Sequence, residues 1–290
     1  MIDSINNNQK QQTINKDIHF SGIGLHTGKY AKVAIKPSGE NTGIVFERSD
    51  INNNNKINAL WNNVTSTVLS TTISNNDNVS VSTIEHLMSA FSGMHIDNAL
   101  VVIDSLEVPI MDGSSEPFVK LIEKSGIKVQ DSKRNIIEIK KEIEVTHNDS
   151  FVRISPNKEF SIDFEIEFES HLINKQARQL QLINGNYKSD ISSARTFGFE
   201  RDVNQLRSNG FALGGSLENA VVVGEDNILN KEGLRYTDEF VRHKILDSIG
   251  DLYLAGYPVR GYFVGKKSGH FLNNELLKKL LSDKSNYQIV

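Results

Sequence analysis

The chain has 290 residues, with 32 basic and 36 acidic side chains, a formal net charge of −4 and a pI near 6.1. At roughly 100–200 residues per domain, this length predicts two domains that each bury a core. The near balance of charges removes the electrostatic footprint of a general nucleic-acid binder. Because the chain has no cysteine, disulfides, thiolate metal sites and a cysteine nucleophile are excluded. Any metal must therefore be bound by histidine and carboxylate.

The first 17 residues are polar and rich in Asn and Gln. They show neither the apolar core of a secretory signal nor the Arg-rich pattern of a transit peptide. The longest apolar runs, such as 98–103 and 220–223, have the length of a strand and are too short to span a membrane. We therefore expect a cytoplasmic protein without stable membrane insertion, in which residues 1–17 form a polar N-terminal segment.

In the first half, residues 18–36 read as two strands around a glycine turn, and a further strand ends near Arg48. The run from Ser82 to Gly93 predicts a helix, because Glu85 follows Ser82 at the spacing of a capping box. A buried strand is predicted over 98–104 and a short helix over 116–126, closed by Gly126. Residues 130–135 are polar without periodicity, and they are the best candidate for a linker.

The second half begins with strands, including a strict alternation of apolar and polar residues over 160–170. A helix around 200–208, a strand over 220–224, a long helix over 237–256 and a strand over 259–265 follow, and a final helix is predicted over 273–284. Runs of strands followed by helices, without strict alternation, predict the α+β class in both halves.

The helix predicted over 237–256 carries the main candidate for chemistry. Its apolar residues at 241, 245, 249 and 252 fall on one face, and His243, Asp247 and Asp251 follow one another at intervals of four on the opposite face. One interpretation is an ordinary solvated face. The other is one half of a metal site, in which an imidazole and a carboxylate project side by side. The spacing alone does not decide between them.

The first helix adds Glu85 and His86, which point about 100° apart on a helix. If His86 binds a metal, Glu85 lies beside that metal, within reach of a bound water. The alternative is that Glu85 only completes the capping box and that His86 is a packed core histidine. His270 follows a glycine in a predicted loop before the last helix, and taken alone it has no assignable role.

Several motifs occur in an order that resembles one known family. These are EHLMSAF, DNALVVID, PIMDGSSEPFV, SARTFGF, RSNGFALGGSLENAVVV, EFVRHKILDSIGDLYLAG and GHFLNN. They resemble the bacterial UDP-3-O-acyl-N-acetylglucosamine deacetylases, zinc amidases of lipid A biosynthesis. The similarity extends over about residues 18–280, and the RHKILDS block is its most specific part.

The resemblance implies two similar two-layer α/β sandwich domains, 18–130 and 131–283, with the active site between them. It also implies that His86, His243 and Asp247 bind Zn²⁺, although Fe²⁺ suits the same nitrogen and oxygen ligands. The catalytic roles that it implies are a general base, Glu85; a general acid, His270; a carboxylate that orients the acid, Asp251; and a hydroxyl that supports the oxyanion, Thr196.

The resemblance further implies a substrate that is an acylated UDP-sugar. Phe197 and Lys244 resemble residues near its sugar and diphosphate. An apolar insert around 196–223 resembles the passage for the acyl chain, lined by Val203, Ala212, Ala220 and Val222. Without the resemblance, we would interpret these four residues as an ordinary local βαβ core. The expected activity is hydrolysis of the N-acetyl group, by a protein that we expect to be monomeric.

Two other functions compete with this hypothesis. A different zinc hydrolase, either another sugar amidase or a phosphoesterase, would use the same ligands, but phosphoesterases usually require paired metals and more carboxylates. A non-catalytic protein that binds a sugar nucleotide would not need Glu85, His270 and three metal ligands together. Release of acetate from the acylated UDP-sugar distinguishes the hypothesis from both.

Overall fold

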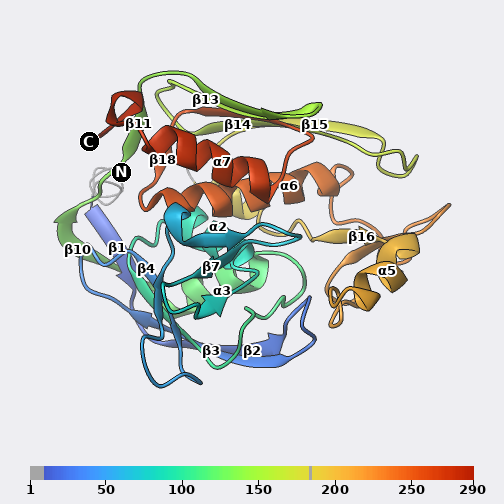
Figure 1. Ribbon diagram of the computed structural model, residues 1–290, viewed down its shortest axis with the longest axis horizontal. Coiled ribbons are helices and arrows are strands. Elements are labelled where there is room, and N and C mark those ends of the chain that lie inside the picture. Colours follow the sequence, from blue (N-terminus) through green and yellow to red (C-terminus); the bar gives the residue numbers. More distant parts are fainter. Residues whose placement is uncertain (1–9, 183–184) are drawn as a thin grey trace.

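The computed structural model describes residues 10–182 and 185–290. Two five-stranded sheets form the outer layers, and helices from both halves of the chain lie between them (Figure 1). This arrangement of helices and sheets confirms the predicted α+β class. None of the helices in the two described ranges is both long enough and apolar enough to cross a membrane.

The sheet of the first half has the strand order β2-β3-β9-β4-β5, in which the β9–β4 pair is parallel and the other pairs are antiparallel. Its inward residues, among them Val33, Ile35, Phe46 and Val101, are buried against two helices. The strands are β2 (Ile18–Ile23), β3 (Tyr30–Pro37), β4 (Ile44–Arg48), β5 (Lys56–Asn58) and β9 (Ala99–Ile103); the helices are α2 (Glu85–Gly93) and α3 (Glu116–Ser125). A small sheet precedes α2 and consists of β6 (Val64–Ser66), β7 (Thr72–Ser74) and β8 (Ser80–Val81), after the 3-10 turn η1 (Trp61–Asn63).

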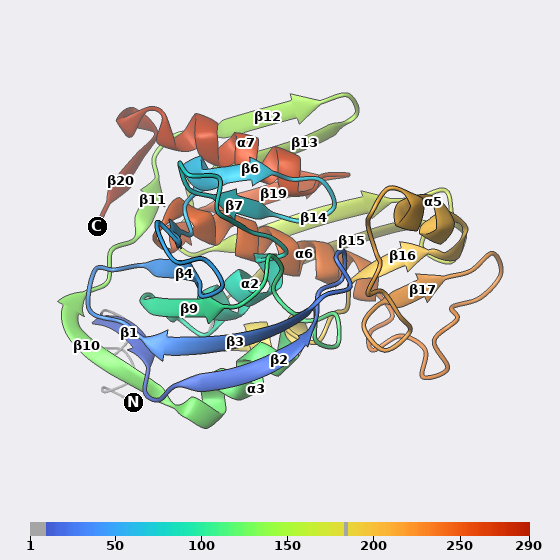
Figure 2. The same cartoon turned by 60° about the horizontal axis from the view of Figure 1, so that its bottom comes forward.

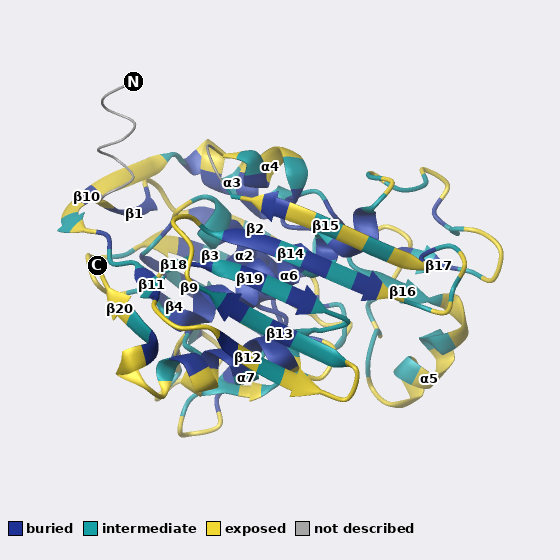
Figure 3. Ribbon diagram, turned by 90° about the horizontal axis from the view of Figure 1, so that it is seen from above, coloured by how far each residue is buried: buried dark blue, intermediate teal, exposed yellow. Residues whose placement is uncertain are grey.

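The sheet of the second half has the order β12-β13-β19-β14-β15, and again only its β19–β14 pair is parallel. The two halves therefore share one strand topology, although the sequence shows no repeat. The strands are β12 (Ile143–His147), β13 (Ser150–Ser155), β14 (Ser161–Glu167), β15 (Lys175–Gln181) and β19 (Tyr262–Lys266), and the helices are α6 (Glu239–Leu252), the 3-10 turn η3 (Tyr253–Ala255) and α7 (His270–Leu281). Buried residues alternate along β13, β14 and β19, and exposed residues gather on β12 and β15 at the edges (Figure 3).

A separate lobe extends from one end of the layers (Figure 2). It contains two short parallel strands, β16 (Phe197–Phe199) and β17 (Val221–Val223). Along the chain, the 3-10 turn η2 (Glu200–Asp202) and helix α5 (Val203–Ser208) connect them. The short helix α4 (Asn186–Asp190) precedes it. The lobe coincides with the insert that the sequence predicts around 196–223.

The predicted linker and N-terminal segment are more structured than their composition indicated. The polar run 130–135 largely belongs to strand β10 (Ile127–Lys133), which pairs antiparallel with β1 (Lys10–Ile14). A solvent-facing strand needs no apolar periodicity when backbone pairing and Gln side chains hold it, so the polar composition gave no sign of this strand. The role of 130–135 as a linker between domains stays a prediction. Residues 1–9 lie outside the described residues. A further small sheet joins β11 (Ile137–Ile139), β18 (Val259–Arg260) and β20 (Tyr287–Ile289), the last after the 3-10 turn η4 (Lys284–Asn286).

Candidate active site and metal centre

Helix α6 is buried on nearly all sides. Val241, Ile245 and Ile249 are fully buried in the core, and the face that bears His243 and Asp247 is buried as well. The interpretation of that face as solvated was therefore wrong. Helix α2 packs against α6, and at Gly250 the contact is so close that a Cβ atom would lie 2.0 Å from the carbonyl oxygen of Glu85. Only glycine allows this approach, which brings the polar residues of the two helices together.

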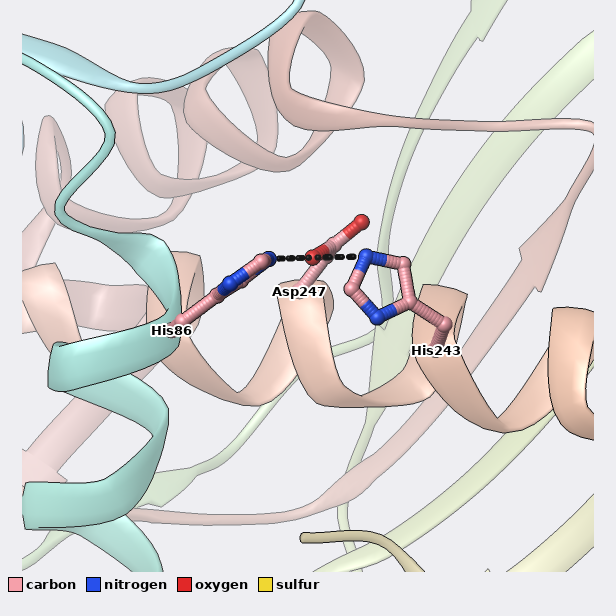
Figure 4. A group of neighbouring side chains, drawn as sticks. All are labelled: His86, His243 and Asp247. Atoms are coloured by element: carbon pink, nitrogen blue, oxygen red, sulfur yellow. Dashed lines mark ion pairs between the residues drawn. The ribbon is translucent and has the colours of Figure 1, made fainter. Parts of the chain in front are cut away.

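His86 of α2 and His243 and Asp247 of α6 form a buried group (Figure 4). The Oδ1 atom of Asp247 lies 3.4 Å from Nε2 of His86 and 3.3 Å from Nε2 of His243. This Oδ1 atom is buried and has no hydrogen-bond partner among the described residues. Leaving such an acceptor unsatisfied is costly in a protein interior, and a cation at the meeting point of the three atoms would satisfy it. Two imidazoles and one carboxylate are the ligand set of a catalytic site with an open fourth position.

The surroundings of these side chains favour the protonation states that a metal requires. Nδ1 of His243 lies 3.0 Å from the carbonyl oxygen of Ala194, so this nitrogen carries the proton and Nε2 presents its lone pair to Asp247. Burial lowers the pKa of His243 to about 3, which keeps the ring neutral. Burial opposes ionisation of Asp247, but His243 and Lys244 hold the pKa of that carboxyl well below its usual value. The group is therefore ready to bind a cation.

A second polar group adjoins the first. Nδ1 of His270 lies 2.7 Å from Oδ2 of Asp251, and its Nε2 lies 3.8 Å from Oε1 of Glu85. Burial alone would lower the pKa of His270, but the charge and hydrogen bond of Asp251 outweigh it and raise that pKa to about 9. Burial raises the pKa of Glu85 above its usual value. The site thus combines a protonated imidazole with a carboxylate of increased basicity.

Comparison with known proteins agrees with this geometry. The family model described as UDP-3-O-acyl N-acetylglycosamine deacetylase matches residues 11–282. The chain belongs to this family. Proteins named UDP-3-O-acyl-N-acetylglucosamine deacetylase are similar over almost the whole chain. The one from Syntrophus aciditrophicus is 44% identical over 277 residues, covering 96% of this chain and 88% of its own. Those from Geobacter sp. strain M21 and Shewanella violacea are 48% and 45% identical, each covering 97% of this chain and 92% of its own.

Two local predictions around these family residues were wrong. Helix α2 begins at Glu85 and not at Ser82, and no side chain caps it. The carboxylate of Glu85 instead accepts a hydrogen bond from the backbone N–H of Thr71, so it points into the site and not back along its own chain. His270 is the first residue of α7 and does not lie in a loop before it. In that place its ring reaches Asp251 on the neighbouring helix.

The segment after Ala194 brings the next predicted residues to the edge of the metal group. Arg195 and Glu239 form a buried ion pair, with 2.8 Å between Nε and Oε1, that fixes this segment to the start of α6. The backbone N–H of Thr196 donates to Gly113 at 2.8 Å, and the ring of Phe197 lies 6.3 Å from that of His243. Phe197 therefore borders the metal group, and Thr196 precedes it in the chain; the roles of both toward a substrate stay predictions.

Lys244 lies on the outer side of the metal group and is partly buried. Its Nζ donates to Oδ2 of Asp247 at 2.7 Å, and the side chain is 20% exposed. Burial alone would lower the pKa of Lys244, but Asp247 raises that pKa above its usual value, so the ammonium stays charged. Lys244 therefore forms an ion pair with Asp247, a predicted metal ligand. Contact with a diphosphate stays a prediction.

The four residues predicted to line the acyl passage all lie in the lobe and are all half-buried. They are Val203, Ala212, Ala220 and Val222. In β17 the neighbours of Val222, residues 221 and 223, are fully buried, so Val222 points to the other side of the strand. The structure brings the four residues into one lobe beside the site. The passage itself stays a prediction.

His26 is a residue of this site that the sequence interpretation missed, because its motif indicated only a turn. Its backbone N–H donates to Glu107, and its Nδ1 lies 3.4 Å from the backbone nitrogen of Ala212. Burial lowers the pKa of His26 and outweighs the charge of Glu107, which raises that pKa; the charges of His270 and His86 add smaller lowering effects. Its Nε2 atom is buried and finds no partner in the described part of the chain. Nothing in the local sequence places this ring near His86 and His270, since long-range packing brings it there.

Proposed function

We propose that this protein hydrolyses the N-acetyl group of UDP-3-O-[(3R)-3-hydroxyacyl]-N-acetylglucosamine, releasing acetate and the free amine, as a cytoplasmic enzyme of lipid A biosynthesis. Membership in the deacetylase family supports the substrate. The observation that carries the chemistry is the convergence of Glu85 and His270 on a buried group of two histidines and one aspartate. An amide is a poor electrophile with a poor leaving group, and this set supplies what its hydrolysis needs.

His86, His243 and Asp247 would hold one divalent cation, which we propose to be Zn²⁺; Fe²⁺ suits the same ligands. When bound, such a cation polarises a carbonyl group and lowers the pKa of a coordinated water. The protein's own contribution is to keep His243 neutral by burial, to hold its proton on Nδ1 through Ala194 and to keep Asp247 anionic through Lys244. Both states are set before any ligand arrives, so little reorganisation is needed.

The proton transfers are assigned to Glu85 and His270. Glu85 accepts a proton from the attacking water, and burial raises its pKa toward the range of an effective general base. His270 is protonated at neutral pH and donates its proton to the departing amine nitrogen. Asp251 orients the imidazole through its Nδ1 atom and stabilises its positive charge. We assign the hydroxyl of Thr196, two residues after the Ala194 carbonyl that contacts His243, to support of the oxyanion.

The outer parts of the substrate are assigned to residues around this centre. Phe197 would pack against the sugar and Lys244 would face the diphosphate. The acyl chain would lie in the lobe of residues 196–223, against Val203, Ala212, Ala220 and Val222. Each buried CH₂ group contributes about 0.8 kcal/mol. A substrate without the chain should therefore bind far more weakly.

Purified protein supplied with Zn²⁺ tests this proposal. It should release acetate from the acylated UDP-sugar, and much more slowly from UDP-N-acetylglucosamine without the acyl chain. Cleavage of other amides but not this one would indicate a different amidase. Binding of the sugar nucleotide without release of acetate would indicate the non-catalytic alternative. Equal efficiency on the acylated and non-acylated sugars would contradict both the passage and the place in lipid A synthesis.

A further inference from the structure

Thr71, just before β7, contacts both carboxylates of the acid–base group. Its backbone N–H donates to Oε2 of Glu85 at 3.0 Å, and its hydroxyl donates to Oδ1 of Asp251 at 2.7 Å. The residue is 2% exposed. Glu85 lies on α2 and Asp251 on α6, so one residue connects side chains that are distant in sequence and belong to different halves of the fold.

The other oxygens of the same two carboxylates face His270. Oδ2 of Asp251 lies 2.7 Å from its Nδ1, and Oε1 of Glu85 lies 3.8 Å from its Nε2. Thr71, Glu85, His270 and Asp251 therefore form a closed ring of polar contacts. In this ring, each carboxylate has one oxygen held by Thr71 and the other turned to the imidazole.

The two carboxylate oxygens of Asp251 differ in the number of their hydrogen-bond donors. Oδ2 accepts from Asn273 at 2.9 Å in addition to its contact with His270. In the described part of the chain, Oδ1 has the hydroxyl of Thr71 as its donor, and no second donor reaches it. Without that hydroxyl, a buried carboxylate oxygen would lose its hydrogen bond, and the carboxylate would rotate to recover one. Such a rotation moves the oxygen that orients His270.

We propose that Thr71 is a positioning residue for the deacetylation, acting through its hydroxyl on Asp251 and through its N–H on Glu85. It selects Oε1 of Glu85 as the oxygen that accepts the proton and fixes the direction in which His270 presents Nε2. Thr71 is buried, and within the described residues it makes no hydrogen bond to His86, His243 or Asp247, so its effect passes through these two carboxylates. The proposal rests on the proposed function, because it assigns Thr71 to the same reaction.

The test compares three variants of the full chain loaded with metal. Thr71→Val keeps the shape and the backbone N–H and removes the hydroxyl, whereas Thr71→Ser keeps the hydroxyl. Thr72→Val removes the hydroxyl of the adjacent threonine, which lies outside the ring, and serves as the matched control. We expect Thr71→Val to lower kcat by about 10- to 100-fold, the range for loss of a hydrogen bond to a charged group. Its KM and metal content should stay within about twofold of the unchanged protein.

Thr71→Ser should restore most of the kcat, and Thr72→Val should leave it unchanged. A kcat for Thr71→Val within about twofold of the unchanged protein would overturn the proposal. So would a Ser variant that is as slow as the Val variant. If Thr71→Val does not fold, Thr71→Ala replaces it in the same comparison, since Ala also keeps the backbone N–H.

A spectroscopic readout separates this proposal from the proposed function. In the metal-free protein, the Nδ1–H of His270 that donates to Asp251 should give a slowly exchanging NMR signal, identified by its loss in His270→Ala. We expect this signal to broaden or vanish in Thr71→Val and to persist in Thr71→Ser and Thr72→Val. An unchanged signal in Thr71→Val would contradict the role of Thr71. If the unchanged protein releases no acetate, the proposed function fails, and this signal still decides whether Thr71 holds Asp251.

Discussion

Replacing Asp251 by Asn removes one negative charge beside His270 and keeps the shape of the side chain. In the native protein, burial lowers the pKa of His270, and Asp251 more than offsets this, so the value rises from 6.5 to about 9. Each pH unit of this difference corresponds to about 1.4 kcal/mol. The protonated imidazole is therefore favoured by about 3 kcal/mol in the folded state. In Asp251→Asn we expect the pKa of His270 to fall by about two pH units, so that only about half of the rings are protonated at neutral pH.

The consequence for stability has a definite sign. Because the folded pKa is the higher one, the contribution of His270 is complete below pH 6.5 and is lost as the pH rises through about 9. The stability difference between the native protein and Asp251→Asn should therefore shrink between these values. NMR titration of His270 in metal-free protein and denaturant unfolding at several pH values measure the two effects. Asp226→Asn, in an exposed loop, is the control. A His270 pKa that stays near 9 in Asp251→Asn would refute the reasoning.

Three further predictions concern the other parts of the site. His86→Ala or Asp247→Ala should remove metal and activity together, and stoichiometric metal in an active variant would contradict the ligand assignment. Glu85→Ala should keep the metal, measured by elemental analysis, and lower kcat by about 10²–10⁴-fold, the usual range for a general base; an unchanged kcat would exclude that role. Ala212→Phe or Ala220→Phe should abolish activity on long-chain substrate while metal content and thermal unfolding stay native, and unimpaired turnover would place the acyl chain elsewhere.

The sequence predicted which residues form this site better than it predicted how tertiary packing brings them together. The spacing of His243, Asp247 and Asp251 placed them on one face of a helix, because helical periodicity is a local property. It could not show that this face is buried, since the burial comes from α2, which is distant in sequence. The close approach at Gly250 and the role of Thr71 likewise depend on tertiary packing. The assignment of ligands came from motifs that resemble a family and not from periodicity.

Local sequence patterns gave wrong predictions where a polar group bonds a partner outside its own motif. Ser82 and Glu85 have the spacing of a capping box, but the carboxylate of Glu85 bonds the N–H of Thr71 instead. The polar run 130–135 indicated a break, yet most of it belongs to strand β10, which pairs with the distant strand β1. Strand pairing at such separation leaves little trace in a single sequence. The division into domains 18–130 and 131–283 stays a prediction, although the shared strand order of the two sheets is consistent with it.

The central claim is that one cation held by His86, His243 and Asp247 makes this protein a deacetylase. The most direct test titrates Zn²⁺ into metal-free protein while acetate release from the acylated UDP-sugar is measured. We expect activity to rise linearly and to reach its full value at one equivalent of Zn²⁺ per chain. A His243→Ala variant should stay inactive throughout the titration. Full acetate release from the metal-free protein, or from His243→Ala at one equivalent, would contradict the account.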